Sequence, residues 1–169
     1  MIFRPISPDE ARPVIAKWHY IPSMPSNPDY CFGAEDNGMI VWAGVFVRCN
    51  NSKGFPVLEA ITHAKDPSSK LQSSQAMTKS CKYLKSKGEH LIITFCEVRM
   101  STGTLYKASH WNFSGMANMP PDSRIEAVFS DAGDYYFFWK SLTTEGQAYA
   151  EQFNLKTLPY TQAPKQLNG

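Results

Sequence analysis

The middle of the chain alternates strand, helix and strand, and this order constrains the fold more than any other feature. VLEAITHA at 57–64 predicts a strand, QAMTKSCKYLKSKG at 75–88 predicts an amphipathic helix, and LIITFCEV at 91–98 predicts a second, buried strand. In such a unit the two strands run parallel, and the crossover between them is right-handed. We therefore expect a parallel pair near the centre of the sheet.

The segments before this unit predict antiparallel structure. SPDE at 7–10 has the form of a capping box, and the main first helix is expected at about 13–20, ending before Pro22. Two apolar segments, YCFGAE and MIVWAGVFV, flank Asp36-Asn37-Gly38. Because Asn-Gly favours the tight turns that join antiparallel strands, the two segments predict a β-hairpin.

The segments after the unit predict a short helix and more strands. GTLYKASH at 103–110 predicts the helix, WNF at 111–113 an extended segment, and 124–130 with 134–140 a closing hairpin across Asp131-Ala132-Gly133. The expected fold class is therefore α+β, a mixed α/β arrangement with a central mixed sheet flanked by helices.

Length and composition limit the remaining possibilities. A chain of 169 residues suits one domain, expected over 1–160, followed by a partly ordered tail at 161–169. With 17 Lys and Arg against 15 Asp and Glu, the net charge of +2 excludes a polycation. The four cysteines have no CxxC spacing, no signal peptide is evident, and the longest apolar run is too short for a bilayer. A soluble, cytoplasmic protein with reduced thiols is expected.

The order of elements, together with GTLYKASHW, resembles the GNAT acyltransferases. The resemblance implies a splayed central sheet, and it places Tyr106 where GNAT enzymes commonly carry the tyrosine that protonates the departing thiolate of coenzyme A. The alternative is an amphipathic tyrosine that buries its ring and keeps its hydroxyl in water.

A closer resemblance, over nearly the whole chain, is to the Mom family of phage proteins, which modify adenine in DNA. It rests on KWHY at 17–20, LEAIT at 58–62, TFCEVRMSTGTLYKASHWNFSG at 94–115, YYFFWK at 135–140 and LPY at 158–160. Glu97 stands where the family usually has aspartate, and Thr62 where it usually has arginine. The resemblance implies a GNAT-like fold, an adenine acceptor in DNA, a bacterial host cytoplasm and protection of phage DNA from restriction.

Four residues are candidates for catalysis: His19, Tyr20, Glu97 and Tyr106. His19 and Tyr20 end the first helix beside a proline-rich loop, so we expect them to face one cleft with Glu97 and Tyr106. The family resemblance also implies iron, for which His19 and Glu97 are a possible, incomplete ligand pair. The alternatives are a histidine stabilised by the helix dipole and a glutamate paired with Arg99 or Lys107.

The donor site is expected at the loop KLQSSQA. The resemblance to GNAT enzymes implies a glycine-rich loop there, but this loop has no glycine, and Lys70, Ser73 and Ser74 are the candidates for contacting a phosphate. A plain N-cap explains both serines without any ligand. The donor stays open between acetyl-CoA and another acyl or aminoacyl compound.

A local excess of basic residues predicts DNA as the acceptor. Residues 61–90 hold six lysines, and Arg99, Lys107 and His110 are expected nearby, although solvated lysines need no ligand. Tyr30 and Trp111 are candidates for stacking on an extruded base. Three functions therefore remain: transfer of an acyl-derived or carbamoylmethyl-type group to adenine N6, ordinary N-acetylation of a small amine or peptide, and nucleic-acid binding without catalysis.

Overall fold

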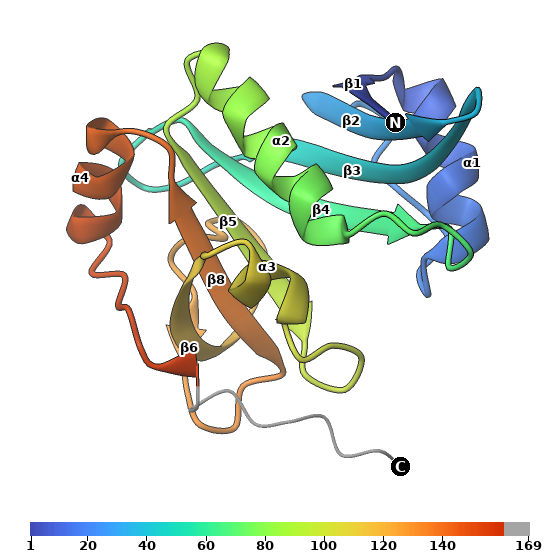
Figure 1. Ribbon diagram of the computed structural model, residues 1–169. Helices are drawn as coiled ribbons and strands as arrows, with labels where there is room; N and C mark the ends of the chain where they lie inside the picture. Colours follow the sequence, from blue (N-terminus) through green and yellow to red (C-terminus); the bar gives the residue numbers. More distant parts are fainter. Residues whose placement is uncertain (161–169) are drawn as a thin grey trace.

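One eight-stranded mixed sheet organises residues 1–160, which are the residues that the computed structural model describes (Figure 1). The strand order across the sheet is β1-β2-β3-β4-β5-β8-β6-β7. The predicted tail at 161–169 lies outside the described residues. The strands are β1 (Ile2–Pro5), β2 (Tyr30–Asp36), β3 (Met39–Cys49), β4 (Val57–Lys65), β5 (Leu91–Glu97), β6 (Asn112–Asn118), β7 (Val128–Phe129) and β8 (Tyr135–Ser141).

The predicted parallel pair is confirmed, and it opens along its length. β4 and β5 run parallel and are joined by helix α2 (Ser73–Ser86), but they pair only from Val57↔Leu91 to Glu59↔Ile93. Beyond that point both strands continue, but they no longer pair with each other. The Thr94 hydroxyl donates to the carbonyl oxygen of Ala60 at 2.8 Å, which bridges the base of the opening. The sheet is therefore splayed at its centre.

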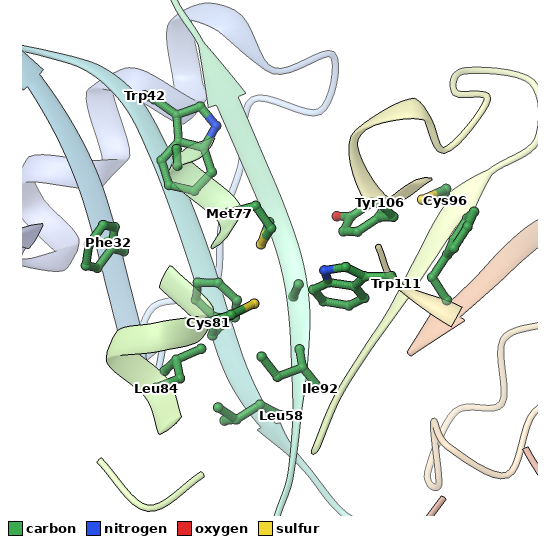
Figure 2. Close-up of a cluster of buried hydrophobic side chains, with 14 of the residues drawn as sticks. Phe32, Trp42, Leu58, Met77, Cys81, Leu84, Ile92, Cys96, Tyr106 and Trp111 are labelled. Atoms are coloured by element: carbon green, nitrogen blue, oxygen red, sulfur yellow. The ribbon is translucent and has the colours of Figure 1, made fainter. Parts of the chain in front are cut away.

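Helices cover both faces of the sheet. α2 and the short helix α3 (Thr104–Ala108) pack on one face, in a buried cluster that includes Trp42, Met77, Tyr106 and Trp111 (Figure 2). Helices α1 (Pro8–Trp18) and α4 (Thr144–Gln152) pack on the other face, against two further buried clusters. No helix within residues 1–160 is long and apolar enough to cross a bilayer.

The N-terminal signals are confirmed, with shifted helix ends. Ser7 and Glu10 form the capping box, and α1 starts at Pro8 and runs through Pro13. It ends at Trp18 because His19 is extended, with φ −92° and ψ 142°. The hairpin turn between β2 and β3 uses positive φ at Asn37 (50°) and Gly38 (77°), as an Asn-Gly turn requires.

The predicted hairpin of 124–130 with 134–140 is wrong. β8 lies between β5 and β6 and is antiparallel to both, and the two-residue β7 pairs with β6 instead. Burial explains the arrangement: residues 136–139 are at most 2% exposed and require neighbours on all sides, whereas Val128 is 67% exposed and suits an edge. β1 and α4 were not predicted. All four cysteines are buried and free.

Candidate functional site

A cavity of about 420 Å³ lies where β4 and β5 diverge. Its walls come from both splayed strands, from the segment after α1, and from the segment between β5 and α3. All four residues predicted to be catalytic line it: His19, Tyr20, Glu97 and Tyr106. The structure therefore brings them to one cavity as expected, while their catalytic roles remain predictions.

His19 and Tyr20 form one wall near the mouth. Their rings stack with centroids 4.5 Å apart. The His19 Nδ1 atom lies 2.8 Å from the carbonyl oxygen of Ile21 and 3.0 Å from its amide nitrogen. When Nδ1 carries the proton and donates to that carbonyl, Nε2 is left as an acceptor for other partners. The pKa of the Tyr20 hydroxyl is raised, first by burial and then by the negative charge of Glu97. Tyr20 and Glu97 are thus electrostatic neighbours across the cavity.

Tyr106 lies at the inner end of the cavity. It is 4% exposed, its hydroxyl lies 3.4 Å from the Thr94 hydroxyl, and burial raises its pKa. Helix α3 begins after Gly103, whose φ is 71°, and a Cβ there would lie 2.5 Å from the Phe138 ring. Glycine at 103 therefore lets α3 start close against β8, with Tyr106 directed inward. The hydroxyl stays protonated at neutral pH and is available as a hydrogen-bond donor.

His63 is a cavity residue that the sequence analysis missed. The register between β3 and β4 shifts so that Val45 faces Thr62 while Phe46 faces Ala60, which leaves Ile61 as an extra residue in β4. After this bulge His63 pairs with Gly44 and shares a face with Trp42, on the side of Tyr106. Burial, with a smaller contribution from His19, lowers the pKa of His63 to about 4. Its imidazole is therefore neutral at pH 7.

A buried ion pair, also missed, forms another part of the wall. Glu59 on β4 is 4% exposed, and its two carboxylate oxygens accept hydrogen bonds from Arg124 at 2.8 and 3.0 Å. The Arg124 guanidinium also lies 5.4 Å from the centroid of the Phe95 ring. The pair joins the loop after β6 to the splayed part of the sheet. Nothing in the local sequence around Arg124 predicts this long-range contact.

Thr62 supplies a polar atom that has no partner. Its Oγ1 atom is buried in the cavity wall and makes no hydrogen bond within residues 1–160. The indole nitrogens of Trp42 and Trp111 are likewise buried and unpaired among the described residues. An unsatisfied buried polar group is costly, so the Thr62 hydroxyl favours a polar ligand in the cavity.

The residues predicted to bind nucleic acid are not gathered at the cavity. Trp111 is 1% exposed in the core, so its predicted stacking on a base is wrong. Tyr30 lies on β2 and donates to Glu89 at 3.0 Å, and it does not line the cavity. Arg99 is exposed in a small hollow beside Glu97, and Lys107 is half-buried on α3. His110 is exposed and borders a groove between α2 and α3.

The loop predicted to bind the donor lies beside that groove, away from the cavity. Lys70 is exposed, Ser73 and Ser74 are the first two residues of α2, and the N-cap is Gln72, which makes no side-chain cap. Capping by the two serines, the alternative explanation, is therefore wrong. The Lys65 ammonium group donates to the carbonyls of Ser69 and Leu71, which ties the loop to β4.

Coenzyme A, which the fold implies, does not fit this arrangement. The groove at α2 and the cavity share no lining residue. Met77, Tyr106 and Trp111, each at most 4% exposed, belong to the cluster packed between α2 and the splayed strands (Figure 2). Neither Ser73 nor Ser74 is among the residues that line the cavity.

Iron, which the family resemblance implies, finds no complete ligand set. Among residues 1–160 no three His, Cys, Asp or Glu side chains are placed to hold a metal ion. The predicted ligands His19 and Glu97 line the same cavity but lack a third partner of these types. We therefore derive no chemical step through a metal.

Comparisons with known proteins agree with this geometry. Residues 1–126 match the model of the Mom protein family. The chain belongs to the Mom protein family. Among curated proteins no match to it is found. The match covers the first three quarters of this Mom-family chain. This part contains β1 to β6 and the cavity residues His19, His63, Glu97 and Tyr106.

Solved structures show the fold. A GNAT-family N-acetyltransferase from Escherichia coli in complex with CoA is 12% identical, with a TM-score of 0.63, and the match covers 86% of this chain and 83% of that one. An N-acetyltransferase from Staphylococcus aureus is 14% identical, with a TM-score of 0.56, and the match covers 84% of this chain and 98% of that one. The ribosomal-protein-S18-alanine N-acetyltransferase from Escherichia coli is 11% identical, with a TM-score of 0.59, and the match covers 85% of this chain and 94% of that one. The expected GNAT-like fold is confirmed.

Proposed function

We propose that this protein transfers an acyl-derived or carbamoylmethyl-type group to the exocyclic N6 of adenine in DNA. Membership of the Mom family supports the acceptor. One observation carries the proposal: a single cavity at the splay of the sheet contains a buried tyrosine hydroxyl, two imidazoles and a carboxylate. These are the groups that transfer to an amine requires, because one proton must leave the amine and another must reach the leaving group.

The positions of the side chains suggest their roles. The N6 nitrogen attacks the donor carbon, the bond to the leaving group breaks, and the Tyr106 hydroxyl donates its proton to that group. The proton lost from N6 passes to a base on the facing wall, where His19 and Glu97 are the nearest to the mouth. His63 is neutral at pH 7 and accepts a hydrogen bond that positions the acceptor beside Tyr106. Thr62 supplies a further hydroxyl.

The donor shares the cavity with the acceptor in this proposal. The groove at α2 and the cavity share no lining residue, so in this proposal the donor enters by the mouth near Tyr20. A volume of about 420 Å³ is sufficient for a base and a small donor but small for a whole coenzyme A. The separation of the α2 groove from the cavity disfavours ordinary acetyl transfer. A cavity rich in proton-transferring groups disfavours a binding protein without activity.

Resistance of DNA to restriction tests the proposal in cells. A bulky group on N6 obstructs the adenine edge that restriction enzymes recognise in the major groove, where the amino group is a hydrogen-bond donor. Plasmid DNA from cells that express the protein should resist enzymes with adenine in their sites. DNA from cells that express Tyr106→Phe should be cut normally, and so should sites without adenine. Normal cutting of all sites in both preparations would contradict the proposal.

A further inference from the structure

Exposed apolar side chains form a rim around the mouth of the cavity. Tyr20 is 52% exposed, Ile21 48% and Met100 48%, and all three line the cavity. Tyr20 and Ile21 follow α1, whereas Met100 follows β5, so the rim is built from two separate segments. Apolar side chains that gather at one place on a surface mark interaction sites, so their position at one opening favours a shared partner.

The inside of the cavity shows what kind of group passes this rim. Below it lie His19, Glu97, Thr62, His63 and the Glu59–Arg124 pair, so the wall is polar on several sides. An apolar peptide side chain would leave these polar groups unpaired, whereas a heterocyclic base offers donors and acceptors at its edge and flat faces for stacking.

Basic residues stand beside the rim. Lys17 precedes Tyr20 by three residues, is exposed, and has its ammonium group 4.8 Å from the centroid of the Trp18 ring. Arg99 is exposed next to Met100. A positive charge therefore lies beside each of the two rim segments, which suits the phosphates on either side of an extruded nucleotide.

We propose that Ile21 and Met100 act as a wedge that enters duplex DNA and takes the place of the adenine extruded into the cavity. This inference rests on the proposed function and adds that the acceptor is double-stranded. Tyr106 is 4% exposed at the inner end of the cavity, so a base that remains stacked in a duplex cannot reach it. Isoleucine and methionine are among the apolar side chains that proteins insert between base steps, because they replace part of the lost stacking.

The fluorescence of 2-aminopurine, which rises when this base leaves the stack, tests the wedge without a donor or turnover. The probe is a pool of duplexes in which 2-aminopurine replaces one adenine between randomised neighbours. The unaltered protein should raise the fluorescence, and the double variant Ile21→Ala, Met100→Ala should lose more than half of that rise. The ratio of duplex to single-strand affinity should also fall. The matched control is Ile2→Ala, Met39→Ala, because these residues are 59% and 61% exposed but lie outside the cavity.

An undiminished fluorescence rise in the Ile21→Ala, Met100→Ala variant would overturn the wedge, and so would an equal loss of affinity for duplex and single strand. Mass analysis of DNA modified by the unaltered protein separates this failure from failure of the proposed function. Modified adenine without any fluorescence rise would leave the proposed function intact and refute the wedge. Absence of both DNA binding and modification would refute both.

Discussion

His63 lies edge-on to Tyr106, with ring centroids 6.1 Å apart and an angle of 76° between the planes. The imidazole makes no hydrogen bond within residues 1–160, and the same ring lies 6.5 Å from Trp42, nearly parallel to it. A half-buried, neutral imidazole thus lies beside the ring of the tyrosine that we propose as the acid. We therefore expect substitutions of His63 to change both stability and activity.

Acid should destabilise the protein through His63. Its pKa is lowered from 6.5 to about 4, so between these values the unfolded state binds more protons than the folded state. The free energy of unfolding therefore falls as pH falls from 6.5 towards 4, by about 2 kcal/mol between pH 7 and pH 5. Replacement His63→Gln should remove this loss, as measured by urea unfolding at the two pH values. Equal losses in both proteins would refute the assignment.

Tyr106→Phe should fold normally and lose most of its activity. The hydroxyl makes one long contact, 3.4 Å to Thr94, so its removal should cost less than about 1 kcal/mol of stability. A positioned acid contributes roughly 10²–10⁴-fold to the rate. Thermal unfolding checks the first expectation, and adenine modified per unit of protein checks the second. A well-folded Tyr106→Phe variant with full activity would exclude this role.

Arg124→Ala should destabilise the protein strongly. The substitution leaves the carboxylate of Glu59, which is 4% exposed, without its partner, and breaking such a pair costs roughly 3–5 kcal/mol. Arg4→Ala is the matched control, because Arg4 also forms ion pairs, with Glu10 and Glu35, but its side chain is 36% exposed. Chemical unfolding of both variants should show a much smaller loss for Arg4→Ala. Adding Glu59→Gln to Arg124→Ala should recover part of the lost stability. Similar losses of unfolding free energy in Arg124→Ala and Arg4→Ala would contradict the account.

Acetyl-CoA should leave the melting temperature unchanged. A ligand at 100 times its dissociation constant stabilises a protein by about 2.7 kcal/mol, which a thermal melt detects easily. We expect little or no shift, because the α2 loop has no glycine and its groove shares no lining residue with the cavity. A GNAT acetyltransferase measured in parallel provides the positive control. A large shift would favour ordinary acetyl transfer.

Local sequence signals predicted the elements that they determine. The Asn37-Gly38 turn fixes the β2–β3 hairpin, and the Ser7 capping box fixes the start of α1. The strand–helix–strand unit predicted the parallel pair. The end of the first helix, together with the family resemblance, predicted that His19, Tyr20, Glu97 and Tyr106 share one cavity, and all four line it.

Features set by long-range pairing were not predictable in this way. His63 turns towards Tyr106 only because the extra residue Ile61 shifts the register of β4, and no local pattern marks such a bulge. Trp111 was expected to be accessible to a base, but it is 1% exposed and packs against Tyr106 in the core. The insertion of β8 between β5 and β6 likewise depends on which buried strand faces which neighbour.

The mass of the adenosine in DNA from expressing cells tests the central claim most directly, because it requires no knowledge of the donor. Plasmid DNA is digested to nucleosides and analysed by mass spectrometry, from iron-replete cells that express either the unaltered protein or Tyr106→Phe. The account predicts a heavier adenosine from the unaltered protein, with the added mass on the base, and nearly none from Tyr106→Phe. Only ordinary adenosine from both cultures, together with acetylation of a small amine by the purified protein, would contradict it.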